Sequence, residues 1–322
     1  RDRLRSRGLG DVYKRQSKRS AGKEIAFMGK TYTVEEATFD SFKGMDIALF
    51  AGGSISKDFA PHAVKAGAVV IDNSSAFRMD PDVPLVVPEV NPQAILKHKG
   101  IIANPNCSTI IMVMALKPIY DLAKIKRVIV STYQAVSGAG KEGIDELDAQ
   151  VREHSEGREM TANILPSASA EKHYPIAFNL IPQIDVFCDN LYTKEEMKMV
   201  NETKKIMEDY EMRITATTIR VPVYRSHSES VNIELEKEVD LGAMREALAK
   251  FPGVTVQDDP SKQEYPMPLY TSEKDDVYVG RLRRDESCEK SYNMWVVGDQ
   301  IRKGAALNTL QIAETMIKNG WI

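Results

Sequence analysis

The predicted fold is organised around residues 103–140, ANPNCSTIIMVMALKPIYDLAKIKRVIVSTYQAVSGAG. After the NPN turn, the apolar run that begins at Ser108 contains no glycine and no early proline, which predicts a buried helix starting at or next to Cys107. Residues 126–135 alternate and predict a strand, and the SGAG sequence after it predicts a turn into another helix. The rest of the chain supplies the neighbours of this helix and strand.

Cys107 occupies a position that activates a thiol. The free N–H groups and the positive dipole end of a helix N-terminus stabilise thiolate over thiol. The same amides can hold the oxyanion that forms when sulfur attacks a carbonyl carbon. A lone cysteine is more often a small apolar core residue, but the polar residues on both sides of Cys107 argue against burial. We therefore interpret Cys107 as a nucleophile.

Composition excludes several classes of protein. The 322 residues are 43% hydrophobic and 28% charged, which is enough chain for two globular domains at roughly 100 to 200 residues each. A net charge of −3 gives no case for nucleic-acid or membrane partners, and no apolar run approaches the roughly 20 residues of a membrane helix. The widely spaced Cys107, Cys188 and Cys288 form neither a disulfide nor a metal pattern, which favours a reducing cytoplasm.

The first 16 residues, RDRLRSRGLGDVYKRQ, differ from the rest of the chain in composition and periodicity. They are rich in arginine and show neither helical nor strand periodicity. Their Gly-x-Gly lacks the preceding strand and following helix that give a phosphate-binding loop its meaning. We interpret residues 1–16 as a non-native segment on an N-terminally truncated reading frame.

From residue 17 onward the pattern is that of a doubly wound α/β sheet. A hairpin is predicted at 23–34, a short helix near Glu35, and a strand at 45–50 that runs through Ala-Gly-Gly-Ser into a helix at 56–66. Further strands are predicted at 68–71 and 83–87, and residues 100–103 lead into Cys107. Beyond residue 140 we expect an irregular region at 155–189, helices at 141–153, 193–207, 241–250 and 304–319, and strands at 214–221, 231–236, 277–283 and 294–297.

Five motifs, in this order and spacing, resemble the aspartate-β-semialdehyde dehydrogenase family: NPNCST at 104–109, STYQAVSGAG at 131–140, KEEMKMVNET at 194–203, RVPVYRSHSES at 220–230 and GDQIRKGAALN at 298–308. The resemblance covers residues 17–322. It implies a Rossmann-like NADP-binding domain, made of 17–106 with 304–322 and lacking its first β-α-β unit. It also implies an inserted α+β catalytic and dimerisation domain at 107–303, and a homodimer.

The resemblance assigns a role to each matching residue. The catalytic set is the nucleophile Cys107, the acid/base His227 and Gln134, which orients the acyl intermediate. Arg220 and Glu195 match the pair that grips the amino-acid end of the substrate. Its phosphate would be bound by Arg78, Asn106 and Lys198. The NADP-binding positions are Arg19, Ser20, Gly52, Ser54, Ser74, Gly138 and Asn308.

The implied reaction is NADPH-dependent reductive dephosphorylation of L-aspartyl 4-phosphate to L-aspartate 4-semialdehyde, with release of phosphate. Cysteine suits it because a thiol attacks near neutral pH and leaves again as thiolate. A histidine is expected to take the thiol proton and return it later. Arginine offers a bidentate fork to the substrate carboxylate, and Glu195 would take the ammonium group beside it. The product serves lysine, threonine, methionine and diaminopimelate biosynthesis.

Three other interpretations share part of this pattern. N-acetyl-glutamyl-phosphate reductases and glyceraldehyde-phosphate dehydrogenases use the same cysteine and histidine chemistry, but NPNCST with Glu195, Lys198 and Arg220 fits aspartyl phosphate better. A non-catalytic dimerising paralogue would not be expected to keep the full catalytic set, whereas an inactive fragment would. The family opens with a strand and a glycine loop where this chain has residues 1–16, so we expect weak NADP binding.

Overall fold

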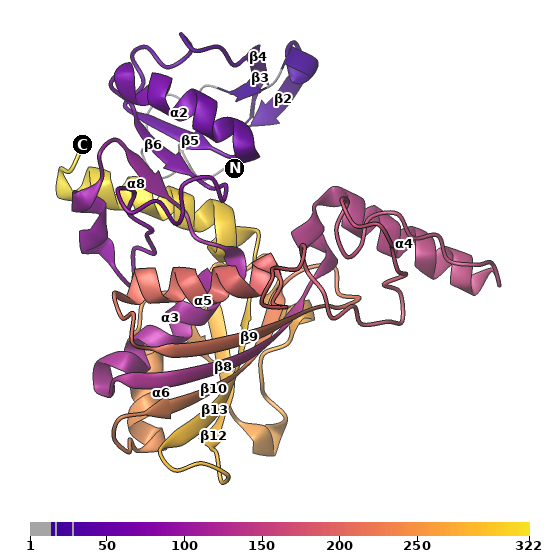
Figure 1. The fold of residues 1–322 in the computed structure, drawn as a ribbon, viewed down its shortest axis with the longest axis vertical. Coiled ribbons are helices and arrows are strands. Elements are labelled where there is room, and N and C mark those ends of the chain that lie inside the picture. The colour runs from indigo at the N-terminus through magenta and orange to yellow at the C-terminus, as the bar shows by residue number, and fades with distance from the viewer. Residues whose placement is uncertain (1–13, 17, 28) are drawn as a thin grey trace. The chain divides into compact units, whose positions relative to one another are not determined.

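The computed structural model describes residues 14–16, 18–27 and 29–322, which form two compact units (Figure 1). Unit 1 comprises Arg1–Asn104 and Ala306–Ile322, and unit 2 comprises Pro105–Ala305. The interpretation of residues 1–16 as non-native falls, apart from 14–16, outside the described residues. Each unit is described by itself below.

Unit 1 is built on a three-stranded parallel sheet in the order β5 (Ile47–Phe50), β6 (Val69–Asp72) and β7 (Ile101–Ala103). Side chains alternate across β6, as the period of a strand requires. Val70 packs with residues of α2 (Ser56–Lys65), whereas Ile71 packs with residues of α8 (Leu307–Asn319). The two helices therefore cover opposite faces of the sheet, which is the arrangement of a doubly wound α/β fold.

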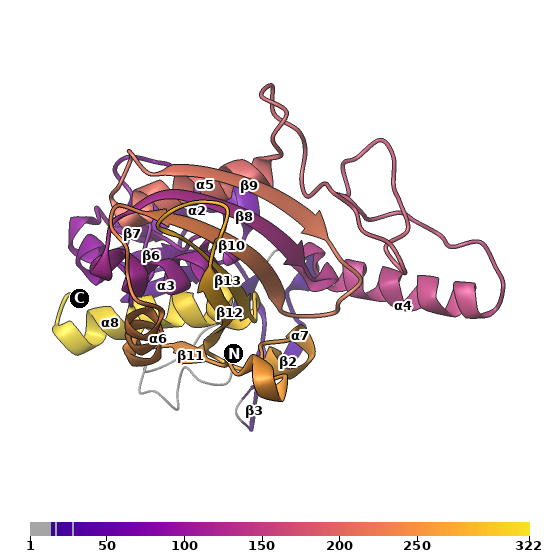
Figure 2. The ribbon, with the colours of Figure 1, turned by 90° about the horizontal axis from the view of Figure 1, so that it is seen from below.

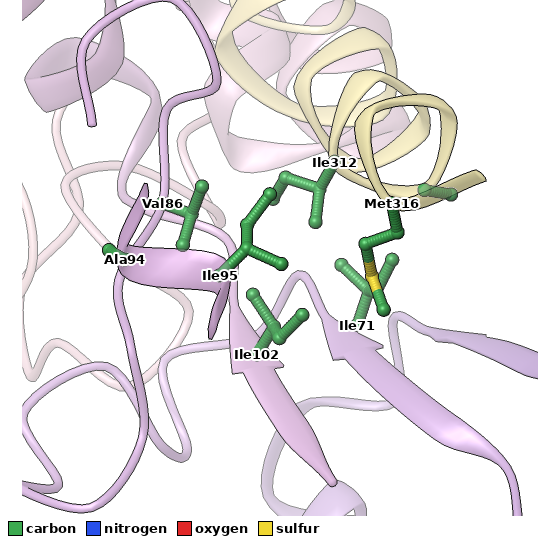
Figure 3. Close-up of a cluster of buried hydrophobic side chains, with 8 residues drawn as sticks. Ile71, Val86, Ala94, Ile95, Ile102, Ile312 and Met316 are labelled. Carbon is green, nitrogen blue, oxygen red and sulfur yellow. The ribbon is translucent and has the colours of Figure 1, made fainter. Parts of the chain in front are cut away.

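The C-terminal helix contributes to the core of unit 1 (Figure 3). Ile312 and Met316 of α8 point onto Ile71 and Ile102 of the sheet, next to Ile95 of the short helix η3 (Pro92–Lys97). All five side chains are buried. Because burying one such side chain stabilises a fold by about 1.5 to 3 kcal/mol, α8 is an integral part of this unit.

Two predicted elements of unit 1 are wrong. The helix expected near Glu35 is the short strand β4 (Glu35–Glu36), which pairs in parallel with β1 (Arg15–Gln16). The strand expected at 83–87 is reduced to one bridge between Leu85 and Ala103, because the prolines at 84 and 88 cannot donate to a ladder. The predicted hairpin is present, and the remaining elements are η1 (Lys18–Ser20), β2 (Glu24–Phe27), β3 (Lys30–Thr33) and η2 (Gly53–Ile55).

Unit 2 contains a six-stranded, mostly antiparallel sheet. Its order is β11-β12-β13-β10-β8-β9, with parallel pairs only at β11-β12 and β8-β9. The strands are β8 (Ile125–Gln134), β9 (Arg213–Arg220), β10 (His227–Leu235), β11 (Val254–Val256), β12 (Val277–Arg284) and β13 (Ser291–Gly298). The other elements are α3 (Cys107–Leu122), η4 (Val136–Ala139), α4 (Lys141–Ser155), α5 (Lys194–Met207), α6 (Leu241–Lys250), η5 (Pro260–Lys262), α7 (Pro268–Thr271) and η6 (Arg302–Ala306).

Helix α3 lies in the centre of unit 2. It contacts α5, α6 and the central strands, and 11 of its 16 residues are buried. This all-round burial explains why its sequence is apolar on every side instead of amphipathic. The helix starts at Cys107, as predicted, so this residue lies at the N-terminal end of the helix, outside the core.

Helix α4 and the irregular segment after it extend away from the sheet of unit 2 (Figures 1 and 2). This arm has a small core of its own, in which Val136 and Leu147 pack against Leu165, Ile176 and Ile181. Throughout the part of the chain that the structure describes, no helix is both long enough and apolar enough to cross a membrane.

Candidate active site

Cys107 is the first residue of α3, and the turn before it is anchored on both sides. The Asn106 side chain caps the helix, its Oδ1 accepting from the N–H of Thr109 at 3.1 Å. The backbone N–H of Asn106 donates to Oε2 of Glu202 at 2.6 Å. On another side, Gly304 packs so closely that a Cβ there would lie 3.0 Å from Cβ of Cys107. The thiol is thus half-buried in a fixed frame.

His227 begins β10 and is fully buried. Its Nδ1 accepts a hydrogen bond from the backbone N–H of Ala135 at 3.1 Å. Burial, and after it the charge of Arg220, holds the pKa of His227 well below its ordinary value of 6.5. Because Nδ1 is an acceptor, the neutral ring carries its hydrogen on Nε2, which has no partner among the described residues. His227 therefore presents a donor, whereas removal of the thiol proton, the role predicted for it, needs a lone pair.

Arg220 ends β9 directly opposite Gln134, the last residue of β8. Its Nη1 donates to the carbonyl oxygen of Ala135 at 2.7 Å, so the loop after β8 holds both Arg220 and His227. Arg220 interacts electrostatically with Glu195 and Cys107. Its Nε is buried and has no hydrogen-bond partner in the described part of the chain. The Nε–H of this guanidinium group is therefore a buried donor that the described part of the protein leaves unsatisfied.

Glu195 joins three of the predicted residues in one buried network. Its Oε1 accepts from Nδ2 of Asn106 at 2.9 Å and from Nε2 of Gln134 at 3.4 Å, and its Oε2 pairs with Nζ of Lys198 at 3.1 Å. Burial raises the pKa of Glu195, but Lys198 and the Asn106 amide together outweigh it, so the pKa lies below its usual value. Glu195 is therefore ionised at neutral pH.

Two residues of this network were missed by the sequence analysis. Asp185 binds Nζ of Lys198 at 3.0 Å from a left-handed backbone conformation with φ +69°. Glu202 holds the turn before the thiol, as described above. It follows Glu195 by seven residues and Lys198 by four on α5, so helical spacing was a signal that all three share one face. The irregular segment around Asp185 carries no such periodicity.

Unit 1 contains Arg78 and most of the predicted cofactor residues. Arg78 is buried, and its guanidinium donates to the carbonyl oxygens of Ser74, Asn104 and Asn73. Ser74 donates to Asp72 at the carboxyl end of β6. Asn308 is fully buried, and its amide donates to Val86 and Asn104. Gly52 and Ser54 lie exposed after β5, Ser20 is half-buried, and the side chain of Arg19 lies outside the described part.

Gly138 was predicted to line the cofactor, and it belongs to unit 2. It lies against two of the predicted site residues, because a Cβ at this position would be 2.7 Å from Nη1 of Arg220 and 3.2 Å from Cε1 of His227. Unit 2 thus brings together eight of the predicted residues: Asn106, Cys107, Gln134, Gly138, Glu195, Lys198, Arg220 and His227. The other seven, Arg19, Ser20, Gly52, Ser54, Arg78, Ser74 and Asn308, lie in unit 1.

This arrangement suits acyl transfer through sulfur. A thiol at a helix N-terminus, a neutral imidazole that donates from Nε2, and a buried guanidinium with a free donor are the groups that stabilise charge on a reacting carbonyl. The fixed carboxylate of Glu195 beside Arg220 supplies the opposite charge. The set can therefore bind a small ligand that carries both an anionic and a cationic group.

Both units match known protein families. Residues 9–98 match the family model described as semialdehyde dehydrogenase, NAD binding domain, and residues 116–303 match semialdehyde dehydrogenase, dimerisation domain. An aspartate-semialdehyde dehydrogenase of Aquifex aeolicus is 57% identical over 310 residues, covering 95% of this chain and 89% of that protein. One of Bacillus subtilis is 54% identical over 304 residues, covering 94% and 88%.

A solved structure is similar along nearly the whole chain. It is the crystal structure of aspartate semialdehyde dehydrogenase II complexed with ASA from Vibrio cholerae, with a TM-score of 0.90 and 44% identity. The match covers 98% of this chain and 93% of that one. The similarity therefore extends over both units.

Proposed function

The chain belongs to the aspartate-semialdehyde dehydrogenase family, and from that premise we propose that it converts L-aspartyl 4-phosphate to L-aspartate 4-semialdehyde with NADPH. The observation that carries this proposal is the position of Cys107 at the N-terminus of α3, in one unit with His227, Arg220 and Glu195. The enzyme would supply the biosynthesis of lysine, threonine, methionine and diaminopimelate.

The first step is attack of the Cys107 thiolate on the acyl phosphate. The sulfur forms a bond to the carbonyl carbon, and the bond from that carbon to the phosphate oxygen breaks, its electron pair leaving with phosphate. The N–H groups at the start of α3 would stabilise the oxyanion. His227 would donate to it from Nε2, because the bond from Ala135 to Nδ1 selects that tautomer. We therefore propose that His227 donates at this step, and its role as the base that takes the thiol proton stays a prediction.

The second step reduces the thioester. NADPH, when bound, supplies hydride to the thioester carbon. The carbonyl group becomes an alkoxide, which re-forms the carbonyl as the carbon–sulfur bond breaks, giving aldehyde and the Cys107 thiolate. Gln134, held by Thr132 and Glu195, would orient the acyl group during this step. The mechanism needs Cys107 as a free thiol, which agrees with the predicted reducing, cytoplasmic location.

The two ends of the substrate would be held by separate charges. The guanidinium group of Arg220 would hold the carboxylate, and Glu195 would hold the ammonium group. Lys198 and Asn106 would bind the phosphate, and phosphate binding by Arg78 stays a prediction of the resemblance. The contacts of Lys198 with Glu195 and Asp185 support this assignment, because they fix its ammonium group and leave its third hydrogen to an anion.

Unit 1 would hold NADP at the carboxyl ends of its parallel strands. Gly52 lies in the exposed turn after β5, where a Cβ would lie 2.7 Å from Cγ2 of Ile55, so a larger residue would need this side chain to shift. Arg19, Ser20, Ser54 and Ser74 complete the proposed set in unit 1, and Gly138 contributes from unit 2. Asn308 would act indirectly through its bonds to Val86 and Asn104, since it is fully buried.

Two finer proposals concern the chain as a whole. We propose that residues 1–16, whose sequence lacks a glycine-rich loop after a strand, do not clasp the pyrophosphate of NADP. We also propose a homodimer formed through unit 2, which the dimerisation-domain match at 116–303 supports. Light scattering of the purified chain measures its mass directly, and a mass of one chain at micromolar concentration would contradict the dimer.

The reaction is tested in the reverse direction. Aspartate semialdehyde should reduce NADP, followed by absorbance, only when phosphate is present, and Cys107→Ala should abolish the signal. In a second protein, a strand, glycine loop, helix and strand replace residues 1–16. This variant shows whether a missing signal is due to weak cofactor binding or to a wrong assignment of the reaction. N-acetylglutamate semialdehyde and glyceraldehyde 3-phosphate serve as competing substrates. If the repaired, folded protein is silent with aspartate semialdehyde, the assignment fails.

A further inference from the structure

Helix α5 binds Asn106, the residue before the thiol, at two points. The backbone N–H of Asn106 donates to Oε2 of Glu202 at 2.6 Å, and its side-chain Nδ2 donates to Oε1 of Glu195 at 2.9 Å. Both acceptors are buried, with Glu202 1% exposed and Glu195 5% exposed. The proposed mechanism uses Glu195 to bind the substrate, but it gives Glu202 no part.

The contact made by Glu202 differs in kind from the contact made by Glu195, because Glu202 binds the main chain. A side-chain amide can leave its partner by rotating, whereas a backbone N–H can leave only if its peptide plane turns. A buried N–H without an acceptor is also costly, so the peptide before Asn106 is held where Glu202 can accept from it. Glu202 therefore fixes the path of the chain at this residue.

The path of the chain at Asn106 sets the first turn of α3. Asn106 is the N-cap, with φ −60° and ψ 145°. Its Oδ1 accepts from the N–H of Thr109 at 3.1 Å, and its carbonyl oxygen accepts from the N–H of Ile110 at 2.9 Å. Cys107 follows directly, so its Cα–Cβ direction depends on the same backbone. The helix terminus favours the thiolate only while its N–H groups and dipole are aimed at the sulfur.

The same helix also carries the proposed charges for the substrate. Glu195, Lys198 and Glu202 lie at helical spacing on one face of α5. The helix packs against α3 in the interior of unit 2. One element thus holds both the acid proposed for the ammonium group and the anchor of the turn that presents the thiol.

We infer that Glu202 is a positioning residue for Cys107: its carboxyl group fixes the backbone of Asn106, and with it the first turn of α3, in the orientation that activates the thiol. The inference rests on the proposed function in taking Cys107 as the nucleophile. It also makes α5 the element that sets the thiol relative to Glu195.

Two substitutions of similar size separate the hydrogen bond from packing. Glu202→Met keeps the length of the side chain and removes the acceptor, whereas Glu202→Gln keeps an oxygen that can accept from Asn106. The readout is the rate at which iodoacetamide alkylates Cys107 at pH 7, measured by peptide mass spectrometry with the half-buried Cys188 as internal reference. We expect Glu202→Met to be alkylated about 2- to 10-fold more slowly at Cys107, the size of a helix-terminus effect on a charge. Glu202→Gln should react at close to the wild-type rate.

The direction of the change distinguishes positioning from a merely structural role. General loosening of the fold would expose the half-buried thiol and speed its alkylation, together with that of Cys188. Unchanged or faster alkylation of Cys107 in Glu202→Met would therefore overturn the inference, and so would equal slowing in both variants. If urea unfolding shows that Glu202→Met does not fold, Glu202→Asp replaces it, because its carboxyl group is drawn back by one methylene.

Glu196 provides a matched control on the same helix. It is a buried acid whose carboxyl group accepts from the backbone N–H groups of Thr193 and Thr218, away from the turn at Asn106. Glu196→Met should lower the urea midpoint at least as much as Glu202→Met does, and it should leave the ratio of Cys107 to Cys188 alkylation unchanged. Equal slowing of Cys107 in the two methionine variants would show that any damage to α5 has this effect, which would refute a specific role for Glu202.

Steady-state kinetics then link the reactivity of the thiol to turnover. Glu202→Met should lower kcat by about 10-fold or more, with a smaller change in the KM for aspartate semialdehyde, because the nucleophile is displaced and the substrate charges remain. Alkylation needs neither substrate nor NADP. If the wild type turns over no aspartate semialdehyde but Cys107 is slowed in Glu202→Met and restored in Glu202→Gln, the proposed reaction is wrong and Glu202 still positions the thiol. If the wild type is active and Glu202→Met matches it in both assays, the reaction stands and this inference is wrong.

Discussion

Gly138→Ala should reduce kcat while leaving the fold intact, because the added methyl group presses on two proposed site residues at once. A Cβ at this position would lie 2.7 Å from Nη1 of Arg220, and 3.2 Å and 3.4 Å from Cε1 and Nε2 of His227. Ordinary contact begins at 3.4 Å, so Nη1 must retreat by about 0.7 Å and the imidazole by a few tenths of an ångström.

Neither side chain can retreat freely. Nη1 of Arg220 donates to the carbonyl oxygen of Ala135 at 2.7 Å, and Nδ1 of His227 accepts from the N–H of the same residue at 3.1 Å. A misplacement of about 1 Å in a catalytic group costs on the order of 100-fold in rate. We therefore expect a loss of about 10- to 100-fold in kcat, equivalent to about 1.4 to 2.8 kcal/mol of transition-state stabilisation.

Steady-state kinetics of phosphate-dependent NADP reduction measures this loss, and urea unfolding measures stability. Gly140→Ala is the matched control, because no atom lies within 4 Å of its added Cβ, although its φ of +87° strains any other residue. We expect the control to lose stability and Gly138→Ala to lose rate. An unchanged kcat in Gly138→Ala would refute the crowding argument. An effect confined to the KM for NADP would assign Gly138 to cofactor binding alone.

Three further predictions follow from the charges of the site and from residues 1–16. Glu229 of β10 is fully buried. Its unfolded carboxyl ionises above its ordinary pKa of 4.5, whereas the folded one stays neutral, so its contribution to stability is present below that pH and is lost as pH rises. Urea titrations should therefore show that the free energy of unfolding of Glu229→Gln, relative to wild type, rises from pH 5 to pH 7 by up to about 1.4 kcal/mol per pH unit. A difference that stays constant over this range would contradict the neutral state of Glu229. Asp185→Asn removes one of the two carboxylates that bind Lys198 and should raise the KM for phosphate severalfold. This increase should be smaller than that caused by Lys198→Met. Equal kinetics in wild type and Asp185→Asn would show that Asp185 does not position the ammonium group. Titration calorimetry should find weak or no NADP binding to the chain with residues 1–16 as they stand, and an affinity equal to that of the variant with a glycine loop would disprove the role given to this segment.

Local signals in the sequence predicted much of the fold. The start of α3 at Cys107 follows from the capping Asn106 and the apolar run after it, which are both local features of the sequence. The helix predicted near Glu35 was wrong, because pairing with β1 overrides the weak preference of a short segment. The strand predicted at 83–87 was too long, because its prolines leave only one bridge to Ala103.

In the candidate site, too, the sequence predicted some features and not others. Its residue types were visible in the motifs, and the helical spacing of Glu195, Lys198 and Glu202 was a usable signal. The partner of Glu202 lies 96 residues away at Asn106, and no periodicity connects the two. Asp185 reaches Lys198 from an irregular segment whose path depends on the packing of the whole arm.

The sequence by itself determined most of the helices and strands, the candidate residues for the chemistry, and that a thiol begins the central helix, because these properties depend mainly on neighbours within a few positions. Only the tertiary structure decided the charge and tautomer of the groups around that thiol. The N–H of Ala135 selects the Nε2–H form of His227, and complete burial favours the neutral form of Glu229. Desolvation and hydrogen bonds between distant strands set these states, and they arise only once the chain has folded.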